Sequence, residues 1–216
     1  MLSDEQIKEK QLSDMAKCCC LLVSSPHGKQ DGSSKNVGTA FFIDRVHLLT
    51  ARHNVTDLRQ KIVYKTAHVT IPGTCFVNYS YVPENENVII CDVIAEESQY
   101  DVAILKASGF CAKTWTTLDD VGPSVNDGAT LIGYPCIRTE KWILEHPGIA
   151  DVMKARDDIE KLLPTGFLSF SAGTIRSCNE SQSTFKYDAS TCPGLSGGLI
   201  VRNGKVIGTP LWLLAI

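Results

Sequence analysis

The chain has 216 residues, a formal net charge of −3, a pI of about 5.9 and 44% hydrophobic residues. These values are typical of a globular chain that forms one domain or two small ones. The acidic balance and the lack of any run of Lys and Arg argue against a nucleic-acid partner.

The start of the chain and its cysteines bear on location. Residues 1–10 are too charged for a signal peptide, and the apolar run at 18–23 is too short to span a bilayer. Nine cysteines, three of them consecutive at 18–20, fit no compact disulfide framework. We therefore expect reduced thiols, a cytoplasmic location, no membrane span, and neither a metal nor a cofactor. Palmitoylation of the cysteine triplet, or metal binding by it, stays open as an alternative.

Short β-rich runs dominate the first half of the chain. A weakly amphipathic helix over residues 3–17 is expected to cover the body of the protein, and a strand follows at 18–23. A β-hairpin is predicted from the runs at 37–43 and 46–50, and further strands are predicted at 61–64, 67–71, 75–81, 88–95 and 102–105. Many short strands without alternating helices predict a sandwich or a barrel.

A polar stretch at 116–127 separates the two halves. We predict an N-terminal helix at 1–17, a first β-barrel at 18–115 and a second at 116–216. Apolar residues at helical spacing over 148–163, ended by Pro164, predict a helix inserted on a loop. Strands of the second half are expected at 129–135, 167–171, 173–177, 184–188, 199–201 and 206–208.

A glycine-rich loop carries the strongest chemical signal. Residues 194–198, GLSGG, place Ser196 among glycines and directly before a strand. Glycines let the backbone turn sharply and bring N–H groups close to a developing oxyanion, which is the setting that a nucleophilic hydroxyl needs. The same pattern also occurs in Gly-rich hairpin turns, so the loop alone does not decide between the two.

Two residues of the first half complete a catalytic pattern. His53 follows the second strand of the predicted hairpin, and Asp101 begins the strand at 102–105. A histidine titrates close enough to neutrality to take a serine proton, and a carboxylate can fix its tautomer. His47 lies inside a strand and is interpreted as structural, while Asp92 lacks the DxAxL pattern that begins at Asp101.

Five segments in the same order resemble trypsin-like serine proteases of the chymotrypsin fold, the PA clan. They are GTAFFI at 38–43, LTARH at 49–53, DVAIL at 101–105, GYP at 133–135 and PGLSGG at 193–198. The nearer likeness is to the branch that contains the HtrA and glutamyl endopeptidase proteins.

The resemblance implies an all-β fold of two six-stranded antiparallel β-barrels with the site in the cleft between them. It also implies a role for each residue of the pattern. His53 would be the general base and acid, Asp101 its orienting partner and Ser196 the acylated nucleophile. The backbone N–H groups of Gly194 and Ser196 would form the oxyanion hole.

The chain departs from the family pattern at its activation and substrate positions. Leu195 replaces the aspartate that receives a new N-terminus in digestive trypsins, so activation by such an insertion is not expected. The expected pocket residues are Ser190 and Thr191, without the acidic residue that selects Arg or Lys. Pro210 removes a backbone donor near the edge that would pair with substrate.

We predict an intracellular serine endopeptidase that acts on protein or peptide substrates through an acyl-enzyme, with a regulatory protein as a candidate partner. The alternative is a catalytically impaired pseudoprotease that serves as a protein-binding module, which the proline and the short ending favour. Esterase or acyl-transferase chemistry at the same site is a third hypothesis that the sequence leaves open.

Overall fold

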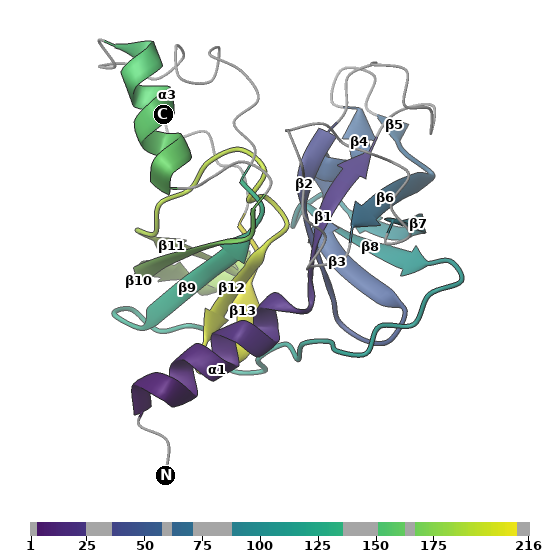
Figure 1. Ribbon diagram of the computed structural model, residues 1–216. Coiled ribbons are helices and arrows are strands. Elements are labelled where there is room, and N and C mark those ends of the chain that lie inside the picture. Colours follow the sequence, from purple (N-terminus) through teal and green to yellow (C-terminus); the bar gives the residue numbers. More distant parts are fainter. Residues whose placement is uncertain are drawn as a thin grey trace.

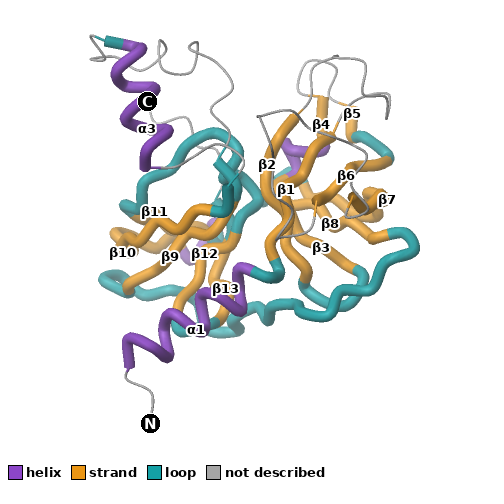
Figure 2. Tube along the Cα trace, viewed as in Figure 1, coloured by secondary structure: helices purple, strands orange, loops and turns teal. Residues whose placement is uncertain are grey.

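The computed structural model of the protein describes residues 4–24, 36–57, 62–70, 88–135, 151–162 and 167–210. Two β-structured halves lie side by side, and the segment 108–127 runs between them along the bottom of the view in Figure 1. Strands and loops make up most of both halves, and the longer helices lie outside the sheets (Figure 2).

The first half is a closed antiparallel barrel. Strand β1 pairs with β2 on one side and with β6 on the other, which closes the sheet in the order β1-β2-β3-β8-β7-β6. The predicted six-stranded first barrel and the hairpin of β2 and β3 are confirmed. The predicted strand at 75–81 lies outside the described residues. The barrel strands are β1 Cys19–Ser24, β2 Asn36–Phe42, β3 His47–Ala51, β6 Thr66–Thr70, β7 Val88–Glu97 and β8 Val102–Ala107, beside a short ribbon of β4 Thr56–Asp57 and β5 Ile62–Val63.

His47 is the first residue of β3, directly after the turn of this hairpin. One carboxylate oxygen of Asp44 accepts hydrogen bonds from the N–H groups of Val46 and His47, each at 2.8 Å, and the other lies 2.7 Å from His47 Nδ1. These donors lower the pKa of Asp44 to about 2, the largest contribution coming from the Val46 N–H. The geometry agrees with the structural interpretation of His47.

The second half differs from the predicted second closed barrel. The described residues form a five-stranded antiparallel sheet, in the order β11-β10-β9-β12-β13. The outer edge of β13 pairs with the connecting segment instead of a sixth strand, through Asp119 N to Val206 O at 2.7 Å and Val206 N to Thr117 O at 3.1 Å. The strands are β9 Gly128–Gly133, β10 Ser169–Asn179, β11 Thr184–Tyr187, β12 Leu199–Arg202 and β13 Lys205–Gly208.

Two strands predicted at 167–171 and 173–177 are one strand, β10. Ala172, which lies between the two predicted strands, and Gly173 both stay in the ladder, opposite Thr130 and Ala129. A Cβ on Gly173 would lie 2.4 Å from the backbone nitrogen of Ala189, so the glycine permits a close crossing of chains rather than a turn. The inserted helix is confirmed as α3 Val152–Leu162, and the N-terminal helix as α1 Asp4–Ala16.

An apolar core joins the two halves. Strand β1 sends Cys20 and Leu22 into the barrel and Cys19 and Leu21 toward the second half. Helix α1 covers this core with Met15, which agrees with the predicted covering role. The shared core consists of Met15, Cys19, Leu21, Phe41, Ile132, Tyr134, Leu199, Val201 and Val206.

The cysteine triplet is explained by this packing. Cys18, Cys19 and Cys20 are 2%, 0% and 0% exposed, and burial raises the pKa of all three thiols. Such thiols offer a lipid no accessible attachment point. Within the described ranges, the structure has no group of three or more side chains that could hold a metal ion.

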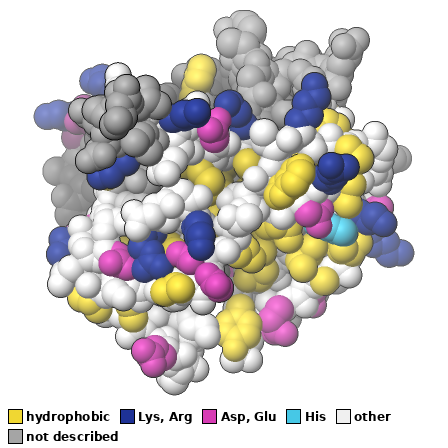
Figure 3. Space-filling view, turned by 90° about the horizontal axis from the view of Figure 1, so that it is seen from below, with side chains coloured by type: hydrophobic (Ala, Val, Ile, Leu, Met, Phe, Trp, Pro, Cys, Tyr) yellow, Lys and Arg dark blue, Asp and Glu magenta, His cyan; other side chains and the backbone are white. Residues whose placement is uncertain are grey.

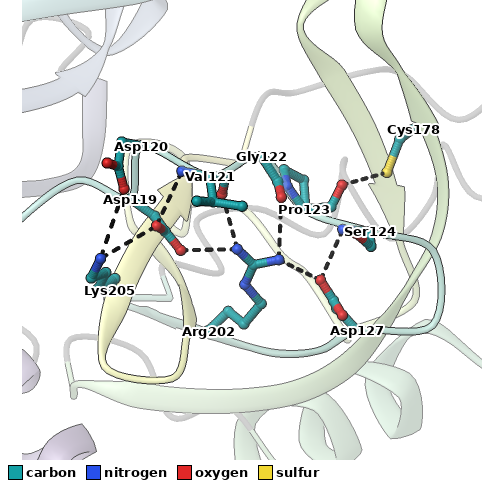
Figure 4. Close-up of polar contacts among 10 residues, drawn as sticks. All are labelled: Asp119, Asp120, Val121, Gly122, Pro123, Ser124, Asp127, Cys178, Arg202 and Lys205. Carbon is teal, nitrogen blue, oxygen red and sulfur yellow. Dashed lines mark hydrogen bonds and ion pairs between the residues drawn. The ribbon is translucent and has the colours of Figure 1, made fainter.

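Arg202 of β12 fixes the connection between the halves to the second sheet (Figure 4). Its guanidinium donates to Asp119 Oδ2 at 2.9 Å and to Asp127 Oδ2 at 2.5 Å, and also to the carbonyls of Val121 and Gly122. The side chains of Arg202 and Asp119 are 13% and 8% exposed. Two carboxylates and two carbonyls therefore share one fork of N–H donors, which holds the connection in place.

Basic and acidic side chains are interspersed on the face seen from below (Figure 3), with hydrophobic side chains between them. The connecting segment contributes exposed apolar side chains at Trp115, Leu118, Val121 and Val125. Among the described residues of this face, positive charge is not gathered into one continuous surface.

We expect Arg202→Met to destabilise the protein at neutral pH and to matter less in acid. Arg202 is the main cause of the lowered pKa of Asp119, and it lowers that of Asp127 after the Ser124 N–H. Because these folded-state pKa values are depressed, their contribution is present above the ordinary aspartate pKa and is lost as pH falls through the folded values. The urea midpoints of wild type and variant should differ at pH 7 and converge below about pH 4. A gap that is constant with pH would contradict this account.

Candidate active site

The glycine-rich loop at 194–198, called the serine loop from here on, is anchored to its own half by an apolar side chain and by a close backbone contact. Leu195 is 2% exposed and packs in the core of the second sheet, and its carbonyl accepts a hydrogen bond from Gly198 N at 2.9 Å. A Cβ on Gly198 would lie 2.4 Å from the carbonyl oxygen of Ile132. Ser196 is thus held on a tight turn above β9, and it is 4% exposed.

His53 lies on a short 3-10 helix, Arg52–Val55, that directly follows β3. Asp101 holds this turn from the start of β8. Its Oδ2 lies 2.5 Å from His53 Nδ1, its Oδ1 accepts the His53 N–H at 2.9 Å, and its carbonyl accepts the Arg52 N–H at 2.8 Å. Asp101 adopts a positive φ of 50°, which Asp tolerates better than most residues.

The pairing with Asp101 assigns the histidine tautomer. An ionised carboxylate can only accept hydrogen bonds, so Nδ1 of His53 carries the proton that lies between them. Nε2 is then the nitrogen that can accept a proton. The side chains are 22% and 28% exposed, so the pair lies at the surface of a partly enclosed site.

The serine loop meets the histidine turn through the Ser196 carbonyl. This oxygen accepts hydrogen bonds from Thr39 N at 2.9 Å and from Asn54 Nδ2 at 2.8 Å. Asn54 is the residue after His53, so one side chain links the turn that carries the histidine to the backbone of the serine. The structure thereby brings the loops of His53, Asp101 and Ser196 together from both halves.

Gly197 permits this contact. Its φ is +80°, and a Cβ here would lie 2.2 Å from the Thr39 carbonyl oxygen and 2.8 Å from Ala51 N. The backbone after the serine therefore runs against the end of β3, and a side chain would separate the two. The glycine pattern of the sequence has its physical reason in this approach.

The remaining candidates fall into two groups. The predicted pocket residues Ser190 and Thr191 are exposed, and they lie between β11 and the serine loop. Asp92 is exposed on β7, accepts a hydrogen bond from Ser108 at 3.2 Å and pairs in register with Lys106. The carboxylate that contacts His53 is that of Asp101 and not that of Asp92.

Sequence reasoning did not single out Thr39, Thr50 or Asn54, although all three lie in or beside quoted motifs. Thr50 Oγ1 donates to the Thr39 carbonyl at 2.7 Å and accepts from Asn54 Nδ2 at 3.1 Å. The three are 0%, 0% and 2% exposed. For Thr39 and Thr50 the available signal was a polar residue at a position where the strand pattern places side chains inward. Asn54 lies on the 3-10 helix, where no strand pattern applies.

Residues 38–208 match the family model of the trypsin-like peptidase domain. The chain belongs to the trypsin-like peptidase family. No curated protein sequence matches it significantly. The predicted resemblance is thus confirmed, and this trypsin-like peptidase is a hydrolase of the serine protease type.

Solved structures show the same fold at low sequence identity. The active form of the Rv3671c protease from M. tuberculosis is similar with a TM-score of 0.61 and 14% identity, over 96% of this chain and 75% of that one. The inactive form of the same protease is similar with a TM-score of 0.59 and 14% identity, over 96% of this chain and 82% of that one. The serine endoprotease from Yersinia pestis is similar with a TM-score of 0.59 and 15% identity, over 93% of this chain and 56% of that one.

The two α-helices of the trypsin-like peptidase that the structure describes, α1 and α3, have 13 and 11 residues. In the described parts of the chain, no helix is long and apolar enough to cross a membrane.

Gly197→Ala should cost more stability than Gly109→Ala. Both glycines have a positive φ, +80° and +70°, so each substitution carries backbone strain of roughly 1–2 kcal/mol. A Cβ at Gly109 meets nothing within 4 Å, whereas at Gly197 it would overlap the backbone of the other half. Urea denaturation gives the loss in free energy of unfolding for each variant, and the difference between the two losses reports the overlap. Equal losses of stability would contradict the close approach of the serine loop to β3.

Proposed function

We propose that this chain is a serine endopeptidase that cleaves peptide bonds through an acyl-enzyme formed on Ser196. The observation that carries the proposal is the His53–Asp101 pair at 2.5 Å, on a turn whose next residue, Asn54, is hydrogen-bonded to the Ser196 backbone. Membership of the trypsin-like peptidase family supports the same chemistry.

The proposed steps use three side chains. Ser196 Oγ attacks the substrate carbonyl carbon while His53 Nε2 accepts the hydroxyl proton, and Asp101 stabilises the imidazolium that forms. The tetrahedral intermediate then expels the amine, which takes the proton from His53 Nε2. Water attacks the resulting ester in the same way, which releases the acid and restores the serine.

The loop geometry supports an oxyanion hole at the Ser196 N–H. This N–H belongs to the peptide unit whose carbonyl, that of Leu195, accepts from Gly198 N at 2.9 Å. In a planar trans peptide the N–H points opposite to the carbonyl, so fixing one fixes the other. With the Gly194 N–H as second donor, the backbone would stabilise charge that develops on the substrate oxygen.

For substrate selection we propose a hydroxyl-lined pocket at Ser190 and Thr191. Both are exposed and precede the serine loop by a few residues. A pocket of this kind accepts small, apolar or acidic side chains and offers no counter-charge to Lys or Arg. Cleavage of a peptide library by wild type would test this, and a preference for basic residues would contradict it.

We also propose that the protein works in a reducing compartment such as the cytoplasm. Six cysteines within the described residues, Cys18, Cys19, Cys20, Cys91, Cys111 and Cys178, are free thiols, and the first four of them are buried. Burial raises the pKa of Cys91 to about 12, which disfavours the reactive thiolate there.

Ser196→Ala should abolish labelling by a fluorophosphonate and lower peptide turnover by about six orders of magnitude, the scale seen when a triad nucleophile is removed. The fold should persist, because only one hydroxyl is lost. Ser108→Ala is the matched control, since Ser108 is an exposed serine bonded to the alternative acid Asp92. Labelling that survives in Ser196→Ala, or a folded wild type that does not label, would overturn the proposed function.

Asp101→Asn should lower the labelling rate by about 10⁴-fold, because the amide favours the wrong histidine tautomer. The equivalent change at the other candidate acid, Asp92→Asn, should leave the rate unchanged. Measured rates of fluorophosphonate labelling at pH 7 decide between the two carboxylates, and a reversed order of effects would contradict the assignment.

A further inference from the structure

A buried polar cluster of Thr39, Thr50 and Asn54 lies between the halves beside the serine loop. We propose that Asn54 and Thr39 are positioning residues, which set the place of the Ser196 nucleophile relative to His53. The inference rests on the proposed function, since it concerns how that serine is held.

Asn54 links the two catalytic loops through one amide group. Its Nδ2 donates to the Ser196 carbonyl at 2.8 Å and to Thr50 Oγ1 at 3.1 Å, and the side chain is buried. Asn54 directly follows His53 in the chain, so its backbone is part of the turn that carries the histidine. A shift of the serine backbone therefore has to stretch a hydrogen bond to the histidine turn.

The space around this amide is built for it. A Cβ on Gly38 would lie 2.3 Å from Nδ2, 2.4 Å from Cγ and 2.6 Å from Oδ1 of Asn54. The amide thus lies directly against the Gly38 backbone, on the strand that carries Thr39. A glycine at position 38 is what lets the side chain reach across to the other half.

Thr39 holds two backbone carbonyls of the serine loop, that of Gly194 and that of Ser196 itself. Its N–H donates to the Ser196 carbonyl at 2.9 Å, and its hydroxyl donates to the Gly194 carbonyl at 2.9 Å. The same hydroxyl accepts the Tyr134 N–H at 2.9 Å, so its orientation is fixed. The carbonyls of Gly194 and Ser196 are both held by the first half.

This arrangement separates positioning from folding. Without the Asn54 amide, the Ser196 carbonyl keeps its bond to Thr39 N, and the apolar core between the halves is unchanged. The serine would gain freedom relative to His53, and small displacements of reacting groups cost large factors in rate. The effect should therefore fall on the chemical step rather than on binding.

The test compares fluorophosphonate labelling kinetics of Asn54→Ala, Thr39→Val and Thr39→Ser with wild type. The first two should lower the maximal labelling rate roughly 10- to 100-fold with little change in the half-saturating probe concentration. Thr39→Ser keeps the hydroxyl and should recover most of the rate. Thr116→Val is the control, because it removes another hydroxyl that is buried, at 3% exposure, beside Met15 and away from the serine loop.

Asn54→Asp adds a readout that depends on pH. An ionised carboxylate cannot donate to the Ser196 carbonyl, whereas a protonated one can. Burial raises a carboxyl pKa, so the rate relative to wild type should recover as the pH is lowered. The titratable or charged groups on the adjoining elements are His53, Asp101, Arg52 and Glu96, and wild type, which has the same groups, is measured over the same pH range.

Hydrogen–deuterium exchange of segment 193–198 keeps the inference separate from the proposed function. Exchange should rise in Asn54→Ala and stay at the wild-type level in Thr116→Val. If exchange is unchanged in Asn54→Ala, or if labelling rates simply follow stability across all the variants, the positioning role is wrong. Failure of wild-type labelling would overturn the proposed function alone, because the exchange result does not depend on reactivity.

Discussion

The carbonyl oxygen of Ser196 accepts two hydrogen bonds from the opposite half, and the geometry of the site depends on them. One donor is a backbone N–H on β2 and the other is the amide beside His53. Both require the backbones of the two halves to approach closely, which a side chain at position 197 would prevent, and a side chain at position 38 would displace the Asn54 amide. The glycines and the polar donors are thus two parts of one constraint.

The apolar core shared by the two halves stabilises the close approach of their backbones. Strand β1 contributes to the barrel core with one face and to the shared core with the other, so neither half can shift without exposing apolar surface. Hydrogen bonds alone contribute modestly to stability, but they are sensitive to distance and angle. Burial of apolar surface therefore holds the halves together, and the polar cluster of Thr39, Thr50 and Asn54 sets their relative position at the site.

Local patterns in the sequence predicted the local structures well. The hairpin of β2 and β3 and the helices α1 and α3 follow from periodicity and turn residues, and the His53–Asp101 pair follows from motifs at strand ends. The predicted closed second barrel was wrong, because the outer edge of β13 pairs with a connecting segment that has no strand pattern. The close approach of β10 to Ala189 at Gly173 could not be predicted either, because a glycine marks a close approach as readily as a turn. The Thr39–Thr50–Asn54 cluster depends on contacts between halves distant in sequence.

Anchors on three sides order the serine loop, and none of them uses a charged group. Leu195 is inserted into the apolar core of the second sheet, Gly198 packs on β9, and the carbonyls of Gly194 and Ser196 are bonded to the first half. All of these residues lie within 38–208, the region that matches the family model. A loop held in this way needs no ion pair at the position before the serine. The leucine there thus replaces an electrostatic anchor with an apolar one, and the order of the candidate nucleophile becomes a property of the folded core itself.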